Sequence, residues 1–99
     1  MDKLTLLLSK NGLSIRKIKP ELRIKLFYHI LTTVHISVSV NYTESEITDK
    51  LKIWLNKNNL LRTDHCELRR WMVDSLVLLR TPQGDSYSIN PELNNTSEH

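Results

Sequence analysis

The chain has 99 residues, of which 39% are hydrophobic and 25% charged, and its formal net charge at pH 7 is +3. This length allows one domain at most, and the composition is that of a folded globular protein, which excludes an intrinsically disordered chain. A lone cysteine excludes an internal disulfide, and the N-terminal apolar run is too short to span a membrane, so we expect a cytoplasmic protein without a membrane partner.

The N-terminal third of the chain predicts a short helix, a short strand and a long helix. Residues 2–12 predict the first helix together with its two ends. Asp2 is the expected N-cap, and Gly12 is the expected left-handed residue beyond the last helical turn. Residues 13–18 alternate weakly and predict the strand. The long helix begins at Pro20, whose missing N–H suits a first helical turn. Its apolar positions 22, 26, 27, 30, 31 and 34 follow helical spacing, so this helix should be central and mostly buried.

The middle of the chain predicts a strand followed by a capped helix. Residues 35–42 (HISVSVNY) are rich in β-branched side chains, which favour a strand. Thr43 and Glu46 have the spacing of a capping box, in which each side chain accepts the other residue's backbone N–H. The helix that they open is expected to bury Ile47, Leu51, Trp54 and Leu55.

The C-terminal part predicts a second capped helix and a β-hairpin. Asp64 and Glu67 repeat the three-residue capping spacing. The helix that follows runs to about residue 76, with a buried stripe formed by Leu68, Met72 and Leu76. Residues 77–89 then alternate on both sides of a Pro-Gln-Gly-Asp turn, as expected of a hairpin.

The order of these elements predicts an α+β fold. Strand, helix, turn, helix and hairpin in succession are typical of a winged helix-turn-helix, here with a short N-terminal helix/strand extension and a C-terminal β-hairpin wing. We expect one such domain over residues 1–90, followed by a flexible polar tail over residues 91–99. In this fold the third core helix lies in the DNA major groove.

Two blocks of the sequence, YTESEITDKL and LRRWMVDSLVLLRTPQGDSY, resemble a bacterial family of domains of unknown function, DUF2087. The matching positions are Tyr42, Thr43, Glu44, Glu46, Ile47, Leu68, Arg69, Arg70, Met72, Val73, Asp74, Leu79, Arg80, Gly84 and Tyr87. The resemblance covers residues 11–90 and implies a winged-helix-like fold, without a biochemical activity. Thr48 stands where the family often has Asn, and Ser75 and Leu76 replace its usual Tyr-Gly.

The arginines of the last helix allow two interpretations. In the first, Arg69 and Arg70 contact a nucleic acid. In the second, they belong to an intramolecular ion-pair network with Asp74 at its centre, formed by Arg23, Arg69, Arg70, Asp74 and Arg80. The second is favoured, because acidic residues lie three and four positions from Arg70 and the hairpin tip holds no basic residue. Arg23 falls on the apolar arc of its helix, so it must reach past the helix end or find a carboxylate.

A second candidate surface for nucleic acid lies near the N-terminus, because residues 1–40 hold seven Lys and Arg against two acidic residues. The basic residues around the lead-in to the central helix are Lys10, Arg16, Lys17, Lys19 and Lys25. Gathered on one face, they could follow a phosphate backbone; otherwise they form a solvated surface. Ile53 and Trp71 lie off or at the border of their apolar stripes, where they either anchor a protein partner or lie under a neighbouring segment.

Catalytic patterns are weak in this sequence. No His and Cys spacing forms a metal site, and two glycines leave no phosphate-binding loop. His65 and Cys66 are neighbours on one helix, so their side chains are expected to point about 100° apart, and the sequence shows no base for Cys66 that a third group holds in place. We therefore expect no enzyme, cofactor, metal or small-molecule substrate. The leading hypothesis is a DNA-binding or transcription-associated module that binds duplex DNA. The alternative is a protein-interaction module without a nucleic-acid role, which binds a protein partner or forms a homodimer on the same scaffold.

Overall fold

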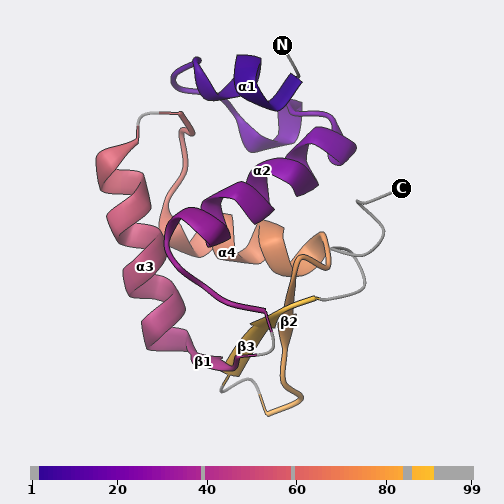
Figure 1. The fold of residues 1–99 in the computed structure, drawn as a ribbon, viewed down its shortest axis with the longest axis vertical. Helices are drawn as coiled ribbons and strands as arrows, with labels where there is room; N and C mark the ends of the chain where they lie inside the picture. Colours follow the sequence, from indigo (N-terminus) through magenta and orange to yellow (C-terminus); the bar gives the residue numbers. More distant parts are fainter. Residues whose placement is uncertain (1–2, 39, 59, 84–85, 91–99) are drawn as a thin grey trace.

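Four helices, one 3₁₀ turn and a three-stranded sheet make up the described part of the computed structural model, residues 3–38, 40–58, 60–83 and 86–90 (Figure 1). The elements are α1 (Lys3–Leu8), η1 (Ile15–Lys17), α2 (Pro20–Thr33), β1 (Tyr42–Thr43), α3 (Glu44–Lys57), α4 (His65–Asp74), β2 (Leu78–Arg80) and β3 (Ser86–Ile89). The predicted α+β class is confirmed. The predicted tail, residues 91–99, lies outside the described residues.

The sheet is antiparallel with the order β1-β3-β2, so the second hairpin strand lies in the middle. Tyr42 faces Tyr87 across the first pair, and Leu78 faces Ile89 across the second. This arrangement, with α2, α3 and α4 packed above it, is compatible with a winged helix-turn-helix whose wing is the β2–β3 hairpin. Figure 1 shows α1 at the end of the molecule opposite the sheet, with α2 in the centre and α3 along one side.

The core centres on α2, as its apolar spacing predicts. Leu26, Phe27, Ile30 and Leu31 are completely buried. The other elements contribute Ile47, Leu51, Trp54, Leu68, Met72, Val77, Leu78, Tyr87 and Ile89. Each fully buried side chain of this size contributes about 1.5–3 kcal/mol through the hydrophobic effect, so one shared core holds the helices and the sheet together.

Side chains fix the starts of α3 and α4. At α3 the predicted capping box is confirmed: the Glu46 N–H donates to Thr43 Oγ1 at 3.1 Å, and the Thr43 N–H donates to Glu46 Oε1 at 2.9 Å. At α4 the Glu67 N–H donates to Asp64 Oδ1 at 2.8 Å. These bonds satisfy helix N–H groups that have no partner within the helix.

Both α2 and α4 end in a left-handed residue, His35 (φ 63°) and Leu76 (φ 61°). At α4 the Leu76 N–H donates to the Val73 carbonyl at 3.0 Å, and the Val77 N–H donates to the Met72 carbonyl at 2.9 Å. This is a Schellman motif, which ends the helix and turns Val77 into the core. The prediction that Leu76 belongs to the buried stripe is therefore wrong, and its side chain is 58% exposed.

The two predicted strands before α3 differ from the structure. Within residues 13–18, only Leu13 pairs, in a single bridge to Leu61, and residues 15–17 form η1. Ile15 and Ile18 are both buried, and a spacing of three fits a 3₁₀ turn better than an alternating strand. Among the described residues of 35–42, Tyr42 alone lies in a strand, and Ile36 is buried as part of the turn that ends α2. The strand prediction for residues 13–18 was therefore wrong, whereas the short strand predicted within residues 35–42 is present as β1 and begins at Tyr42.

The N-terminal helix is shorter than predicted. It ends at Leu8, so Gly12 does not follow it directly, although Gly12 is left-handed as predicted (φ 66°). The proposed cap, Asp2, lies outside the described residues. In the described part of the chain no helix has the length and apolar character that a membrane crossing requires.

Candidate nucleic-acid interface

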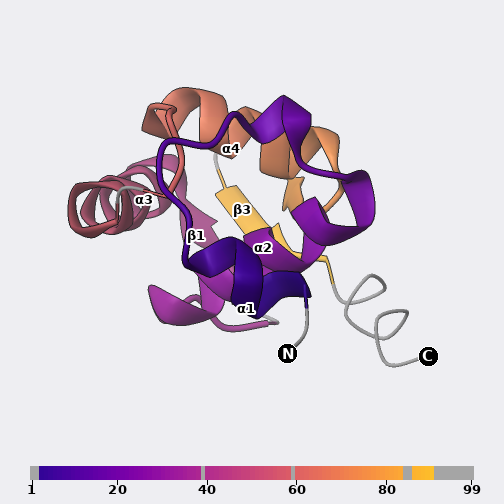
Figure 2. The same ribbon diagram turned by 90° about the horizontal axis from the view of Figure 1, so that it is seen from above.

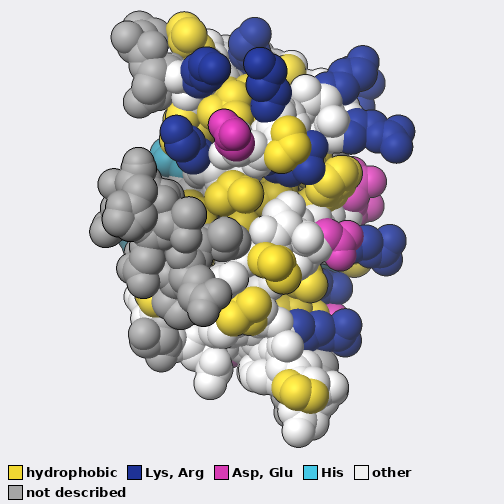
Figure 3. Space-filling model, turned by 90° about the vertical axis from the view of Figure 1, so that its right-hand side faces the viewer, with side chains coloured by type: hydrophobic (Ala, Val, Ile, Leu, Met, Phe, Trp, Pro, Cys, Tyr) yellow, Lys and Arg dark blue, Asp and Glu magenta, His cyan; other side chains and the backbone are white. Residues whose placement is uncertain are grey.

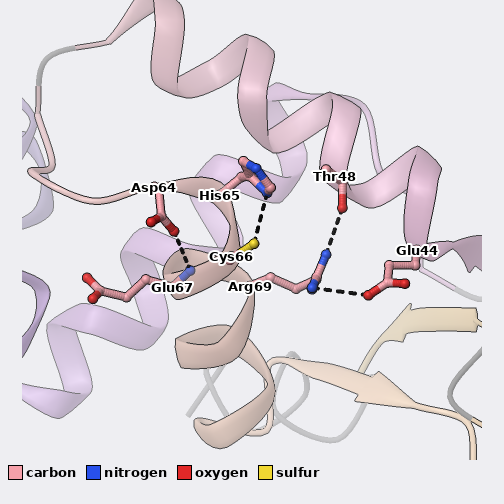
Figure 4. Close-up of polar contacts among 7 residues, drawn as sticks. All are labelled: Glu44, Thr48, Asp64, His65, Cys66, Glu67 and Arg69. Carbon is pink, nitrogen blue, oxygen red and sulfur yellow. Dashed lines mark hydrogen bonds and ion pairs between the residues drawn. The ribbon is translucent and has the colours of Figure 1, made fainter.

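The start of α4 is held by a small set of polar contacts that Figure 4 shows. Asp64 caps the helix through the backbone N–H of Glu67. The side-chain carboxylate of Glu67 also accepts a hydrogen bond from Thr63 Oγ1 at 2.7 Å. The Sγ atom of Cys66, an exposed free thiol, lies 3.5 Å from His65 Nδ1. These local bonds give α4 a defined first turn, which fixes the direction in which its later side chains project.

Arg69 is fixed by contacts with three residues on two other elements, α3 and β3. Its Nη1 donates to Thr48 Oγ1 at 2.7 Å and its Nη2 lies 3.1 Å from Glu44 Oε1, both on α3 (Figure 4). Its guanidinium also lies 5.8 Å from the centroid of the Tyr87 ring on β3. The side chain is only 18% exposed, so these contacts lock α4 to α3 and the sheet.

A hollow of about 350 Å³ lies between α4 and the sheet. We call it the arginine notch; its lining residues are Glu44, Cys66, Arg69, Arg70, Val73, Asp74, Arg80 and Tyr87. Arg70 comes from the exposed face of α4 and Arg80 from the hairpin strand β2, where it faces Tyr87. The notch therefore brings together guanidinium groups from the last helix and from the hairpin.

The ion pairs differ from the network expected around Asp74. Arg69 pairs with Glu44 instead. Within residues 3–38, 40–58, 60–83 and 86–90, this is the one Lys or Arg side chain with a carboxylate oxygen closer than 4.0 Å. Over the same residues, Arg70 and Arg80 have no carboxylate within that distance. Asp74 shares the notch with them but is exposed. Helical spacing brings such groups within reach, yet exposed pairs gain too little energy to hold one geometry.

Arg23 connects the start of α2 to α4. Its Nη2 donates to the Ile18 carbonyl at 2.8 Å, and its guanidinium lies 4.5 Å from the centroid of the Trp71 ring. A carbonyl and an aromatic ring thus take the place of the expected carboxylate. Figure 2 shows the lead-in to α2 passing above α4. Trp71 is half-buried in this contact, whereas Ile53 on α3 is 51% exposed.

The predicted basic cluster gathers around a second hollow, of about 740 Å³, between α1 and the start of α2. We call it the lysine-rimmed hollow; it is lined by Lys3, Leu6, Leu7, Lys10, Leu13, Ser14, Lys17, Ile18, Lys19, Glu21, Leu22 and Lys25. Four of the five predicted basic residues line it, and Arg16 does not. The upper part of Figure 3 shows basic side chains around apolar ones. The role of these residues as phosphate contacts remains a prediction.

The family model described as "Uncharacterized protein conserved in bacteria (DUF2087)" matches residues 18–89. The chain belongs to this family. Neither a curated protein nor a solved structure matches the chain. The match begins at the end of η1 and extends to β3, so it includes the arginine notch and leaves α1 outside.

Two departures from the DUF2087 pattern now have a structural setting. Thr48, which the resemblance marked as a departure, accepts the hydrogen bond from Arg69. Leu76, the other departure that the resemblance marked, is the left-handed residue that follows the end of α4. Glycine adopts this conformation without steric cost, whereas the Cβ of leucine comes too close to the following carbonyl oxygen.

Sequence reasoning missed several members of these sites in the DUF2087 domain. Glu44 and Thr48 precede Arg69 by more than twenty residues, so no local spacing points to them. Lys3 was not assigned to the basic cluster, and the apolar floor of the hollow was not foreseen. The described residues contain no group of three or more His, Cys, Asp or Glu side chains that could hold a metal ion.

Proposed function

We propose that this DUF2087 domain binds duplex DNA, with α4 at the major groove and the arginine notch on the adjacent phosphate backbone. The observation that carries the proposal is the meeting of Arg70 from α4 and Arg80 from the wing in one hollow. In winged helix-turn-helix proteins the corresponding helix and hairpin both approach the DNA, so a phosphate between them accepts hydrogen bonds from both.

The geometry separates the roles of the two neighbouring arginines on α4. Arg69 is mostly buried and committed to Glu44 and Thr48, so its contribution is to position α4. Arg70 is exposed, lines the notch and has no carboxylate within 4.0 Å among the described residues. A guanidinium that does not have to break an ion pair before binding a phosphate loses less free energy on complex formation.

The proposal is tested by fluorescence anisotropy with labelled duplex DNA over a range of salt concentrations. Arg70→Ala and Arg80→Ala should each weaken binding about 3–10-fold and reduce the slope of log K against log salt by about 1. Lys52→Ala is the matched control, because Lys52 is exposed on α3 and lines neither hollow. Absence of binding by the unmodified chain at low salt would refute the proposal, as would equal effects of all three variants.

A protein partner is the second candidate function, favoured by Ile53. This side chain is 51% exposed on α3, whereas Trp71, the other predicted anchor, lies against Arg23. A large apolar side chain in this position can form the centre of an interface. If the unmodified chain is an oligomer in analytical ultracentrifugation, the Ile53→Glu variant should sediment as the 11.6 kDa monomer. A sample that is already monomeric rules out the homodimer.

A further inference from the structure

The side chains around the lysine-rimmed hollow carry a net positive charge. Five lysines line it against a single carboxylate, Glu21. Over the described ranges of the chain, none of these lysines has a carboxylate within 4.0 Å. Like charges held this close repel one another, and an anion that enters the hollow relieves that repulsion.

The floor of the same hollow is apolar. Leu7 and Ile18 are buried at its base, Leu13 and Leu22 are partly buried, and Leu6 is 50% exposed. In the upper part of Figure 3, apolar side chains lie among Lys or Arg side chains, with an acidic side chain between them. A phosphate group can pair with the lysines but has no apolar part to cover the floor. A purely polar anion would therefore leave the leucine and isoleucine side chains without an apolar contact.

We propose that the lysine-rimmed hollow binds a long-chain acyl anion, with its carboxylate among the lysine ammonium groups and its alkyl chain on the leucine floor. The volume of about 740 Å³ lies within the range of roughly 300–1,000 Å³ that is usual for small-molecule sites. This inference goes beyond DNA binding and does not depend on it.

A partner protein fits the hollow less well than a slender ligand. Protein interfaces usually bury about 800 Å² on each partner. Here Leu6 is the one lining side chain among the exposed large hydrophobic residues, and the remaining apolar side chains lie deeper in the hollow. The wall formed by α1 is only six residues long, which is short for seating an amphipathic helix of several turns.

The proposal is tested by isothermal titration calorimetry of the full chain with laurate below its micelle concentration. We expect saturable binding of one laurate per chain, with dodecyl maltoside and acetate each at least about tenfold weaker, because one lacks the charge and the other the alkyl chain. Equal binding of either control compound would overturn the proposal, as would the absence of saturable binding. Binding to anionic vesicles without binding of monomeric laurate would also overturn it, in favour of a membrane surface.

Paired variants separate binding in the hollow from non-specific uptake of an amphiphile. Leu6→Glu should lower laurate affinity about tenfold, whereas Ile53→Glu, at a similarly exposed apolar position on α3, should change it less than about twofold. Residue 6 lies three positions from Lys3 on the same helix, so a glutamate there is compatible with α1. Equal losses in the two variants would contradict a site in the hollow.

A second set of variants, with lysines replaced, keeps the test valid if Leu6→Glu disturbs α1. Replacing Lys17 and Lys25 together by Gln should also lower affinity about tenfold, and replacing Lys52 and Lys57 on α3 should leave it within about twofold. All four side chains are exposed, so folding should be retained, which circular dichroism checks. Unchanged binding in the Lys17 and Lys25 double variant would overturn the role of the rim.

Discussion

Arg69 of α4 and Glu44 of α3 form an ion pair with Nη2 and Oε1 3.1 Å apart, and the two side chains differ sharply in exposure, at 18% and 54%. The difference predicts unequal effects on stability. Arg69→Ala removes the pair, the Thr48 hydrogen bond and the Tyr87 contact, so the free energy of unfolding should fall by about 1–3 kcal/mol. Glu44→Gln should cost only about 0–1 kcal/mol, because Glu44 is largely solvated. Urea unfolding of both variants measures this, and a larger loss for Glu44→Gln would contradict the asymmetry.

Removal of Arg23 should expose Trp71. Arg23→Ala takes away the guanidinium 4.5 Å from the ring centroid and the hydrogen bond to the Ile18 carbonyl. We expect stronger quenching of tryptophan fluorescence by acrylamide and a loss of about 1–2 kcal/mol in unfolding free energy. The other tryptophan, Trp54, is only 4% exposed, so additional quenching reports Trp71. Unchanged quenching would show that other groups shield the ring.

Leu76→Gly should stabilise the protein. Residue 76 has φ 61°, a conformation that costs a residue with a Cβ about 1–2 kcal/mol. Part of this gain is offset by the greater freedom of glycine in the unfolded chain, so we expect a net increase of about 0.5–1 kcal/mol in thermal or urea unfolding. Leu76→Ala keeps the Cβ and should give no such increase. If alanine stabilises as much as glycine, the cause is loss of an exposed leucine and not relief of the left-handed conformation.

Asp74→Asn should strengthen DNA binding under the proposed function. Asp74 lies in the arginine notch without an ion pair among the described residues, so its charge opposes a phosphate there. We expect about 2–5-fold tighter binding at low salt and a smaller difference at high salt. Asp49→Asn, at an exposed position of α3 outside both hollows, should leave affinity within about twofold. Weaker binding by Asp74→Asn would show that this carboxylate supports the interface.

The sequence predicted the helices best where local chemistry defines their ends. Thr43 and Glu46 form their capping box within four residues of chain, so the pattern could be found without knowledge of the fold. The same is true of Pro20 at the start of α2. The strand predicted over residues 13–18 was wrong, and β1 covers only the end of residues 35–42, because β-branched residues are also buried in turns, as Ile15 and Ile36 are. A preference for strands reflects packing more than an intrinsic backbone demand.

The candidate sites were predictable only in part, because long-range packing builds them. The basic cluster was visible as a run of lysines, but its apolar floor depends on α1 packing beside α2. Arg69 was recognised as a residue of interest, whereas its partners Glu44 and Thr48 become neighbours only when α3 packs on α4. Spacing along α4 instead favoured Asp74, since helical periodicity identifies groups within reach and not the partner that burial selects.

The sheet has short outer strands, with two residues in β1 and three in β2, while the longer β3 lies between them. Few backbone N–H and C=O groups on either border are thus available to an incoming strand. Short edges of this kind oppose open-ended stacking of sheets from successive chains and lower the tendency to form fibrils.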